Sequence, residues 1–377
     1  MFDYETLRII WWLLLGVLLA GFAVMDGFDL GVAALVRVLG RDDAERRALL
    51  ETVEPVWEGN QVWLVLGGGA VFAAWPLLYA TSFSGFYFAI LIALAAFIVR
   101  PGGFHFRNKL ADPRWRDAWD WVLTISGIVP PIIFGVAIGN LFLGVPFRFD
   151  DDLRMHYEGS FVGLLGPFPL LVGVLSLVML LMHGAAWAAV KSEAPIAPRA
   201  ERLLGWLAPT FIALYAAAGV FVVFSIDAYA LVGAAAVDGP SNPLRKEVIM
   251  AGRWLDGSAT DRIAWAAALI GLGAAALVAL LARARHHRSA FLASSVCVTA
   301  TVFSFGFALF PFLMPSRLDP RSSLLVWDAS SSEHTLGLML IAAAIFMPLI
   351  IAYTTWVYRV LRGRINLAHV RATHSTY

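Results

Sequence analysis

The 377-residue chain has a single cysteine, Cys297, which lies in an apolar stretch. One cysteine excludes a disulfide, a CxxC redox pair, an iron–sulfur cluster and a thiolate zinc site made by this chain alone. We interpret Cys297 as a small core residue. The net charge is only +1, so no surplus of basic residues indicates nucleic-acid binding. The sequence also lacks a Walker loop, a GxGxxG turn and a GxSxG elbow, which leaves nucleotide and acyl chemistry without support.

Apolar residues are abundant instead, at 60% of the chain with a mean hydropathy of +0.75. Such a chain needs the bilayer as its solvent, because soluble domains are about half apolar. Runs of about 20 apolar residues, long enough to cross a bilayer, predict an all-α polytopic protein with nine transmembrane helices in one membrane domain, 1–377. The first run is expected to be a retained span, because the residues before it are acidic rather than basic. The predicted spans are 9–36, 53–76, 79–99, 119–144, 161–190, 204–225, 263–282, 290–314 and 335–358.

Basic residues are distributed unevenly between the segments that join these runs. Most of the 28 lysines and arginines fall in alternate connections, among them 37–47, 100–116 and the segment after residue 358. Short cytoplasmic loops are enriched in lysine and arginine, so these connections are expected to be cytoplasmic. The N-terminus is then predicted outside and the C-terminus in the cytoplasm. The connections 226–262 and 315–334 contain turn sequences and are predicted to be ordered caps on the outer side.

Several ionisable residues lie inside the apolar runs, where they are costly and commonly functional. Asp26 and Asp29 are three residues apart and share a helix face. Glu58 has no basic residue within helical reach on its own span, and Arg100 and Asp120 border the same side of the membrane. By helical rise, Asp29 and Glu58 lie about 8–12 Å inside that side. This arrangement is expected of a proton input pathway or of a buried ion pair.

The residues alone leave structural interpretations open beside the functional one. Arg100 paired with Asp29 or Asp120 would lock helices together, since buried charges persist best when paired. Asp26 would then satisfy nearby backbone at a glycine-containing turn. His183 is the one histidine within a predicted span, and we interpret it as a hydrogen-bonded interior residue rather than a haem ligand, because no facing histidine completes a pair.

Longer strings in the sequence resemble subunit II of the cytochrome bd family of quinol oxidases, in order and at consistent spacing from residue 1 to about 366. They include WEGNQVWL, GGGAVFAAWP, RPGGFHFR, PPIIFGVAIGNLFLGVPF, FPFLMPS and LLVWDASSS. The resemblance implies two four-helix bundles plus one peripheral helix, in a heterodimer with subunit I in the bacterial inner membrane. It also implies that haem b and haem d are ligated by subunit I, where quinol oxidation is coupled to reduction of O2 to water without proton pumping.

The same resemblance gives roles to individual residues. Asp29, Arg100 and Asp120 stand at positions that support the haem site across the subunit interface. Glu58 stands where the family commonly has an aspartate in a cytoplasmic proton pathway, and His105 stands at a proton entrance where some members have an aspartate. Both positions therefore depart from the family pattern, although histidine can relay protons near neutral pH. A structural quinone and a small accessory subunit occur in some members.

A stand-alone secondary transporter is the alternative from another class, because it too would carry intramembrane carboxylates. Transporters built from repeats have paired, broken helices in their two halves. Here the acidic residues gather in the first four predicted spans. The uneven distribution favours the oxidase subunit.

Overall fold

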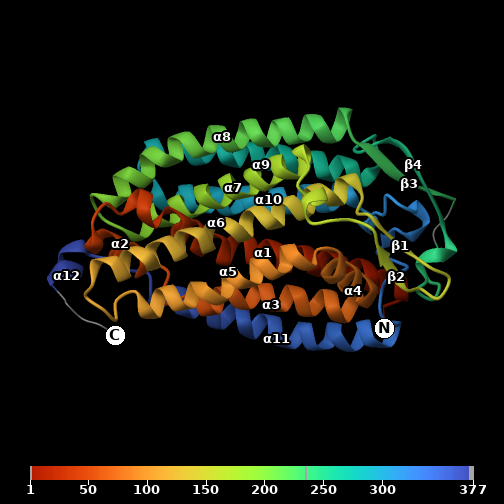
Figure 1. The fold of residues 1–377 in the computed structure, drawn as a ribbon, viewed down its shortest axis with the longest axis horizontal. Coiled ribbons are helices and arrows are strands. Elements are labelled where there is room, and N and C mark those ends of the chain that lie inside the picture. Colours follow the sequence, from red (N-terminus) through yellow and green to blue (C-terminus); the bar gives the residue numbers. More distant parts are fainter. Residues whose placement is uncertain (1, 234–235, 373–377) are drawn as a thin grey trace.

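The computed structural model describes residues 2–233 and 236–372, which form an almost entirely helical molecule (Figure 1). The long helices run side by side along the longest axis, and short strands gather at one end. The helices are α1 (Tyr4–Leu39), α2 (Asp43–Leu50), α3 (Trp57–Ala74), α4 (Pro76–Gly85), α5 (Tyr87–Phe106), α6 (Pro113–Leu143), α7 (Pro167–Lys191), α8 (Ile196–Phe224), α9 (Ala259–Arg283), α10 (His287–Leu309), α11 (Glu333–Val360) and α12 (Leu367–Ala372).

Among the described residues, eight helices are long and apolar enough to cross a membrane, and α3 with α4 makes a ninth span if the pair is taken together. This pair is bent by 119° at a break around Trp75. Pro76 begins α4, a position where its missing N–H costs nothing. The predicted third span, 79–99, is therefore displaced: its first residues belong to α4, and α5 begins at Tyr87. The predicted span 290–314 also ends early, because residues 312–314 form a strand.

α1 is the central helix and contacts α3, α6, α7 and α10. Glycines allow the closest of these approaches. A Cβ atom on Gly31 would lie 2.1 Å from the Leu180 carbonyl oxygen, and one on Gly184 would lie 2.4 Å from the Gly31 carbonyl carbon. On α6, a Cβ on Gly127 would lie 2.5 Å from the Leu30 carbonyl oxygen. Small residues let helices approach closely in membranes, so the polar side chains of α1 are held in a tightly packed setting.

The remaining contacts place α3 and α6 against α1, α5 against α6, and α7 to α10 in a second group. Because α1 and α6 both pack against α7, the two groups share a broad contact. α11 lies at the edge, where Leu336 is its one buried residue. This position is that of a peripheral helix, whereas the division of the others into two four-helix bundles stays a prediction.

The strands form three antiparallel hairpins at one end of the molecule (Figure 1). Arg8, which is fully buried near the start of α1, donates from Nε to Ser330 Oγ at 2.7 Å and thereby fastens this end to the helices. The predicted cap at 315–334 is thus ordered, and so are the described residues of the cap at 226–262, whereas residues 234 and 235 lie outside the described part of the chain. The pairs are β1 (Phe147–Phe149) with β2 (Met155–Tyr157), β3 (Asp227–Val232) with β4 (Glu247–Arg253), and β5 (Phe312–Met314) with β6 (Leu324–Leu325).

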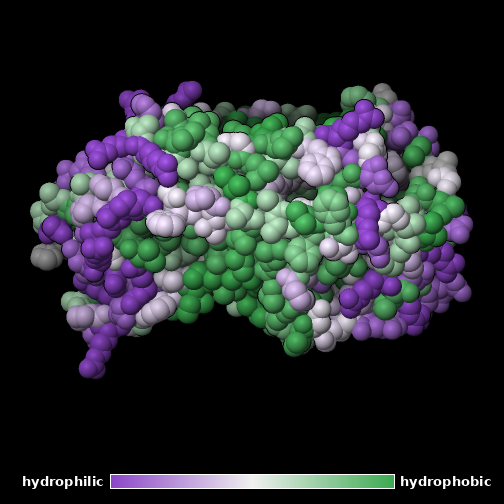
Figure 2. All heavy atoms as spheres, turned by 90° about the horizontal axis from the view of Figure 1, so that it is seen from above, coloured by the Kyte–Doolittle hydropathy of each residue, from purple (hydrophilic) through white to green (hydrophobic). Residues whose placement is uncertain are grey.

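The surface has the pattern of a membrane protein. Figure 2 shows a broad apolar middle between two ends rich in hydrophilic side chains. α1 starts at the end that carries the strands, whereas α12 lies with α2 at the opposite end (Figure 1). The described chain therefore begins on one side of the apolar band and finishes on the other, as an odd number of crossings requires.

Candidate functional site

A buried cluster of polar side chains lies where α1, α3 and α5 meet. Arg100 of α5 donates from Nη2 to Asp26 Oδ1 at 2.6 Å, and both side chains are fully buried. Asp29, one turn further along α1, accepts a hydrogen bond at 2.8 Å from the Asn60 amide of α3. The i, i+3 spacing directs both carboxylates toward α3 and α5, as the shared helix face predicts.

The cluster continues to the peripheral helix. The Tyr358 hydroxyl of α11 donates to Asn60 Oδ1 at 2.7 Å, and this fixes which side of the amide faces Asp29. Because the carbonyl oxygen of Asn60 is held by Tyr358, the amide NH2 group is directed to the carboxylate. Asp26, Asp29, Asn60 and Arg100, together with the partly buried Tyr358, are called the buried cluster below.

The buried cluster is only partly compensated. Two carboxylates share one guanidinium, and Asp26 Oδ2, Asp29 Oδ1 and two nitrogens of Arg100 have no hydrogen-bond partner in the described part of the chain. Such groups are costly inside a protein and are found where a function needs them. The expectation that Arg100 pairs with Asp29 or Asp120 was wrong, because the depth and rotation of α5 bring it to Asp26. Asp26 accordingly binds a side chain and does not serve to satisfy backbone.

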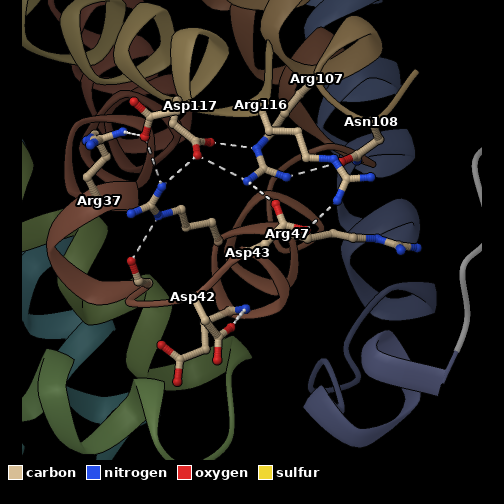
Figure 3. Close-up of polar contacts among 12 residues, drawn as sticks. Arg37, Asp42, Asp43, Arg47, Arg107, Asn108, Arg116 and Asp117 are labelled. Carbon is tan, nitrogen blue, oxygen red and sulfur yellow. Dashed lines mark hydrogen bonds and ion pairs between the residues drawn. The ribbon is translucent and has the colours of Figure 1, made fainter. Parts of the chain in front are cut away.

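A second group of charges lies at the helix ends nearby and is fully paired (Figure 3). Asp120 accepts from Arg107 Nε at 2.6 Å and from Arg46 Nη1 at 3.0 Å. Each of the other two carboxylates in this network likewise has two arginines, Asp43 with Arg107 and Arg116, and Asp117 with Arg37 and Arg46. These seven residues, the helix-end network, join α1, α2, α5 and α6. Asp120 therefore belongs to a different group from Asp29 and Arg100.

Glu58 and His105 are both exposed on the surface of this chain, and Glu58 directly follows Trp57 in the sequence. The rings of Trp57 and His105 are 6.2 Å apart between centroids. Glu58 lies in the first turn of α3, two residues before Asn60, and its side chain makes no hydrogen bond or ion pair within the described residues. The same turn therefore carries a buried residue that contacts Asp29 and an exposed carboxylate.

Glu54 was not singled out from the sequence, although it lies just before this turn. It is half-buried and interacts electrostatically with His105, and burial, reinforced by the nearby Glu51, raises its pKa. Asn60 could be noticed because it lies within the polar turn of the second span. Tyr358 offered no such signal, since tyrosines near span ends are common interfacial residues.

His183 is fully buried and both of its ring nitrogens are engaged. Nδ1 is 2.8 Å from Ser294 Oγ, and Nε2 is 2.8 Å from the Val24 carbonyl oxygen. A haem ligand needs a free imidazole nitrogen, so His183 does not fit that role and is an interior hydrogen-bonded residue, as predicted. Within residues 2–233 and 236–372, no group of three or more His, Cys, Asp or Glu residues is arranged to hold a metal ion.

These features define a multi-pass helical membrane protein with partly compensated ionisable groups in its interior. Comparison with known proteins gives its family: a model for cytochrome bd terminal oxidase subunit II matches residues 7–361, and the chain belongs to this family. It is therefore a subunit of an oxidoreductase complex of the bacterial inner membrane, with a subunit I partner and haem in the complex. The predicted family is confirmed, and the stand-alone transporter is not supported.

Three relatives illustrate the similarity. The chain is 45% identical to cytochrome bd-I ubiquinol oxidase subunit 2 of Escherichia coli (strain K12), over the full length of both chains. It is 29% identical to cytochrome bd ubiquinol oxidase subunit 2 of Bacillus subtilis (strain 168), over 96% of this chain and 97% of the relative. The fold resembles a chain of the bd oxidase of Geobacillus thermodenitrificans, with a TM-score of 0.67 at 17% identity, covering 94% of this chain and 98% of that chain.

Proposed function

We propose that this chain is the non-haem subunit of a quinol oxidase that couples quinol oxidation to the reduction of O2 to water. The observation that carries the proposal is full-length similarity to ubiquinol oxidase subunits at 45% identity. In the complex, haem b and haem d of subunit I supply electron transfer and oxygen chemistry. The engagement of both His183 nitrogens supports placing the haem ligands on subunit I.

The second part of the proposal is that this chain supplies protons from the cytoplasm. Glu58 and His105, with Glu54 beside them, form the entrance, and Asp29 lies further inside. A carboxylate can accept and release protons efficiently when its pKa is near the ambient pH, and the raised pKa of Glu54 moves in that direction. Glu58 keeps the carboxyl group that the family commonly has as aspartate, with one more methylene.

The exposed position of Glu58 supports its transfer of protons to subunit I. A carboxylate on a face that meets lipid would be costly, so we propose that subunit I covers this face. The helices around Glu58 and His105 expose large apolar side chains that suit such an interface: Val62, Val65 and Phe72 of α3, and Phe88, Leu91 and Ile98 of α5.

Asp29, Arg100 and Asp120 are proposed to support the haem site indirectly. All three are fully buried within this chain, so they act through the positions of the helices they join. Arg100 ties α5 to α1, and Asp120 ties α6 to α2 and to the end of α5. The face presented to subunit I depends on where α3 and α5 lie.

For orientation, we propose that the end with α2 and α12 is cytoplasmic. This end carries the arginine-rich connections, and short basic loops favour the cytoplasm. Reporter fusions after Arg47, Lys191 and Arg364 should report cytoplasm, and fusions near Pro240 and Asp319 should report the outer side. Inverted signals would overturn the orientation.

The test of the proposed function is isolation of a tagged copy from membranes that also contain subunit I. A haem-bearing partner should co-purify, and the reduced-minus-oxidised spectrum should show haem b and haem d. Expressed without its partner, the chain should show no stoichiometric haem band. A well-formed haem spectrum on the isolated chain would contradict the proposal. Extraction of the same complex tests for a structural quinone and a small accessory subunit, which stay predictions.

A further inference from the structure

A strongly basic cavity of about 380 Å³ is lined by residues of the end of α7, the turn between α9 and α10, the start of α10 and the segment after α11. These segments lie at the end of the molecule that carries α2 and α12 (Figure 1). The basic lining residues of the cavity are Arg285, His286, His287, Arg288, Arg362 and Arg364; Val190 and Ser289 complete the lining, which contains no carboxylate. α10 begins at His287, so the positive end of that helix adds to the same field.

The positive charge of the cavity is poorly compensated. Within the described residues, Glu201 is the acid that contacts the cavity lining; it bonds to His287 at 2.6 Å and lies 3.8 Å from Arg285. The side chains of Arg288 and Arg362 have no hydrogen bond or ion pair within the part of the chain that the structure describes. The helix-end network differs, because every arginine there has a carboxylate partner. Clustered guanidinium groups repel one another, so this cavity favours an anion.

The position of the cavity indicates where that anion resides. α9 ends at Arg283 and α11 ends at Val360, so the cavity lies at the border of the apolar band. Glu201, which contacts His287 and Arg285 of the cavity lining, itself lines a groove of about 580 Å³ between α8 and α9, whose other charged residues are Arg202 and Arg283. Trp206 in this groove is 76% exposed, and exposed tryptophans are typical of the headgroup level of a bilayer. Pro209 and Ala282 provide an apolar wall beside it.

From this geometry we propose that the cavity binds the phosphate headgroup of an anionic phospholipid, with an acyl chain along the groove between α8 and α9. Arginine suits this role because its guanidinium donates two parallel hydrogen bonds to a phosphate. Basic pockets between helices at the cytoplasmic side of membranes recognise anionic headgroups. The site holds together the ends of α7, α10 and α11, which are far apart in the sequence.

The test uses the purified complex with subunit I and native mass spectrometry at increasing lipid concentration. Dioleoylphosphatidylglycerol should bind more tightly than dioleoylphosphatidylcholine. The double variant Arg288→Gln/Arg362→Gln should weaken phosphatidylglycerol binding about twenty-five-fold, because each basic side chain beside an anionic lipid contributes a factor of about five. Arg288→Lys/Arg362→Lys should retain most of the affinity, since the charge remains.

The matched control is Arg41→Gln/Arg114→Gln, which removes the same charge from exposed positions at the same end but outside the cavity. It should leave the affinity unchanged. Equal affinity for the two lipids, an unaffected Arg288→Gln/Arg362→Gln complex, or an equal loss in the control would each overturn the proposal. Displacement of the lipid by millimolar inorganic phosphate would also overturn it, by making a soluble anion the occupant.

Discussion

The buried cluster and the helix-end network use the same residue types but pair them differently. In the network each of the three carboxylates has two arginine partners, and every one of the four arginines has at least one carboxylate. In the buried cluster two carboxylates share Arg100, and polar atoms remain without partners in the described structure. Complete pairing favours permanently ionised, structural groups, whereas incomplete pairing favours groups that change protonation. The ratio of acids to bases thus indicates a structural role for the helix-end network and a role in proton transfer for the buried cluster.

The largest effect should come from Arg100→Ala. This change leaves Asp26 and Asp29 buried without a counter-charge, and breaking a buried pair costs about 3–5 kcal/mol. We expect a severe loss of assembled haem, measured from the reduced-minus-oxidised spectrum of membranes. Arg116→Ala is the control within the helix-end network, where its partly exposed pair contributes less than about 1 kcal/mol. Normal haem content in Arg100→Ala would remove the distinction between the two groups.

Asp120→Ala should have a smaller effect, which lowers the stability of the complex rather than its haem content or turnover. Arg107 and Arg46 lose a partner, but Arg107 keeps Asp43 and Arg46 keeps Asp117. We expect destabilisation of about 2 kcal/mol, discounted from the cost of breaking a fully buried pair. Thermal unfolding of the complex should shift down while oxygen consumption per haem stays near wild type. A loss of turnover without a change in stability would contradict this and assign Asp120 a role like that of the buried cluster.

Tyr358→Phe should change the pH profile of oxygen consumption through the buried cluster. Loss of the hydroxyl frees the Asn60 amide to rotate away from Asp29, and a net hydrogen bond contributes about 1 kcal/mol. Because Asp29 then loses an oriented donor, the pH profile of oxygen consumption should shift with little loss of haem. Tyr353→Phe is the matched control on the same helix, since Tyr353 is 64% exposed. An identical pH profile in both variants would show that Tyr358 contributes to packing and does not influence Asp29 through Asn60.

Glu54→Gln should have the smallest effect, on the pH dependence of stability. Burial raises the pKa of Glu54, so the folded protein favours its protonated form. Stability from this group is present below the ordinary glutamate pKa and is lost as pH rises through the raised value. The variant should show a flatter decline of melting temperature over that window. Glu193→Gln, at an exposed position of the same end, should keep the wild-type decline; an equal flattening there would implicate net charge.

Much of the fold followed from the sequence because the bilayer imposes long apolar runs. The predicted spans 119–144, 204–225 and 263–282 nearly coincide with α6, α8 and α9 or lie within them. The bend between α3 and α4 did not follow, since Pro76 marks a break but not the direction of the chain after it. The strand at 312–314 was taken as helix because its residues are equally apolar.

The sequence predicted which ionisable residues lie in the interior, but it did not predict which of them pair with one another. Asp29, Arg100 and Asp120 are all buried, as intramembrane charges should be. Their partners depend on the rotation of α5 and α6 about their axes, which spacing within one helix cannot reveal. Tyr358 lies 298 residues from Asn60 in the chain, and no local motif connects the two. Burial of the cluster and exposure of Glu58 likewise depend on tertiary packing.

The most direct test of the proton-delivery account is quinol-driven oxygen consumption per haem d in Glu58→Gln. Glutamine keeps the shape and hydrogen bonding of the side chain but cannot ionise. The variant should assemble with normal haem content and turn over several-fold more slowly, while Glu58→Asp stays near wild type because the carboxyl group remains. Wild-type turnover in Glu58→Gln, at normal haem content, would contradict the account and place the proton entrance elsewhere.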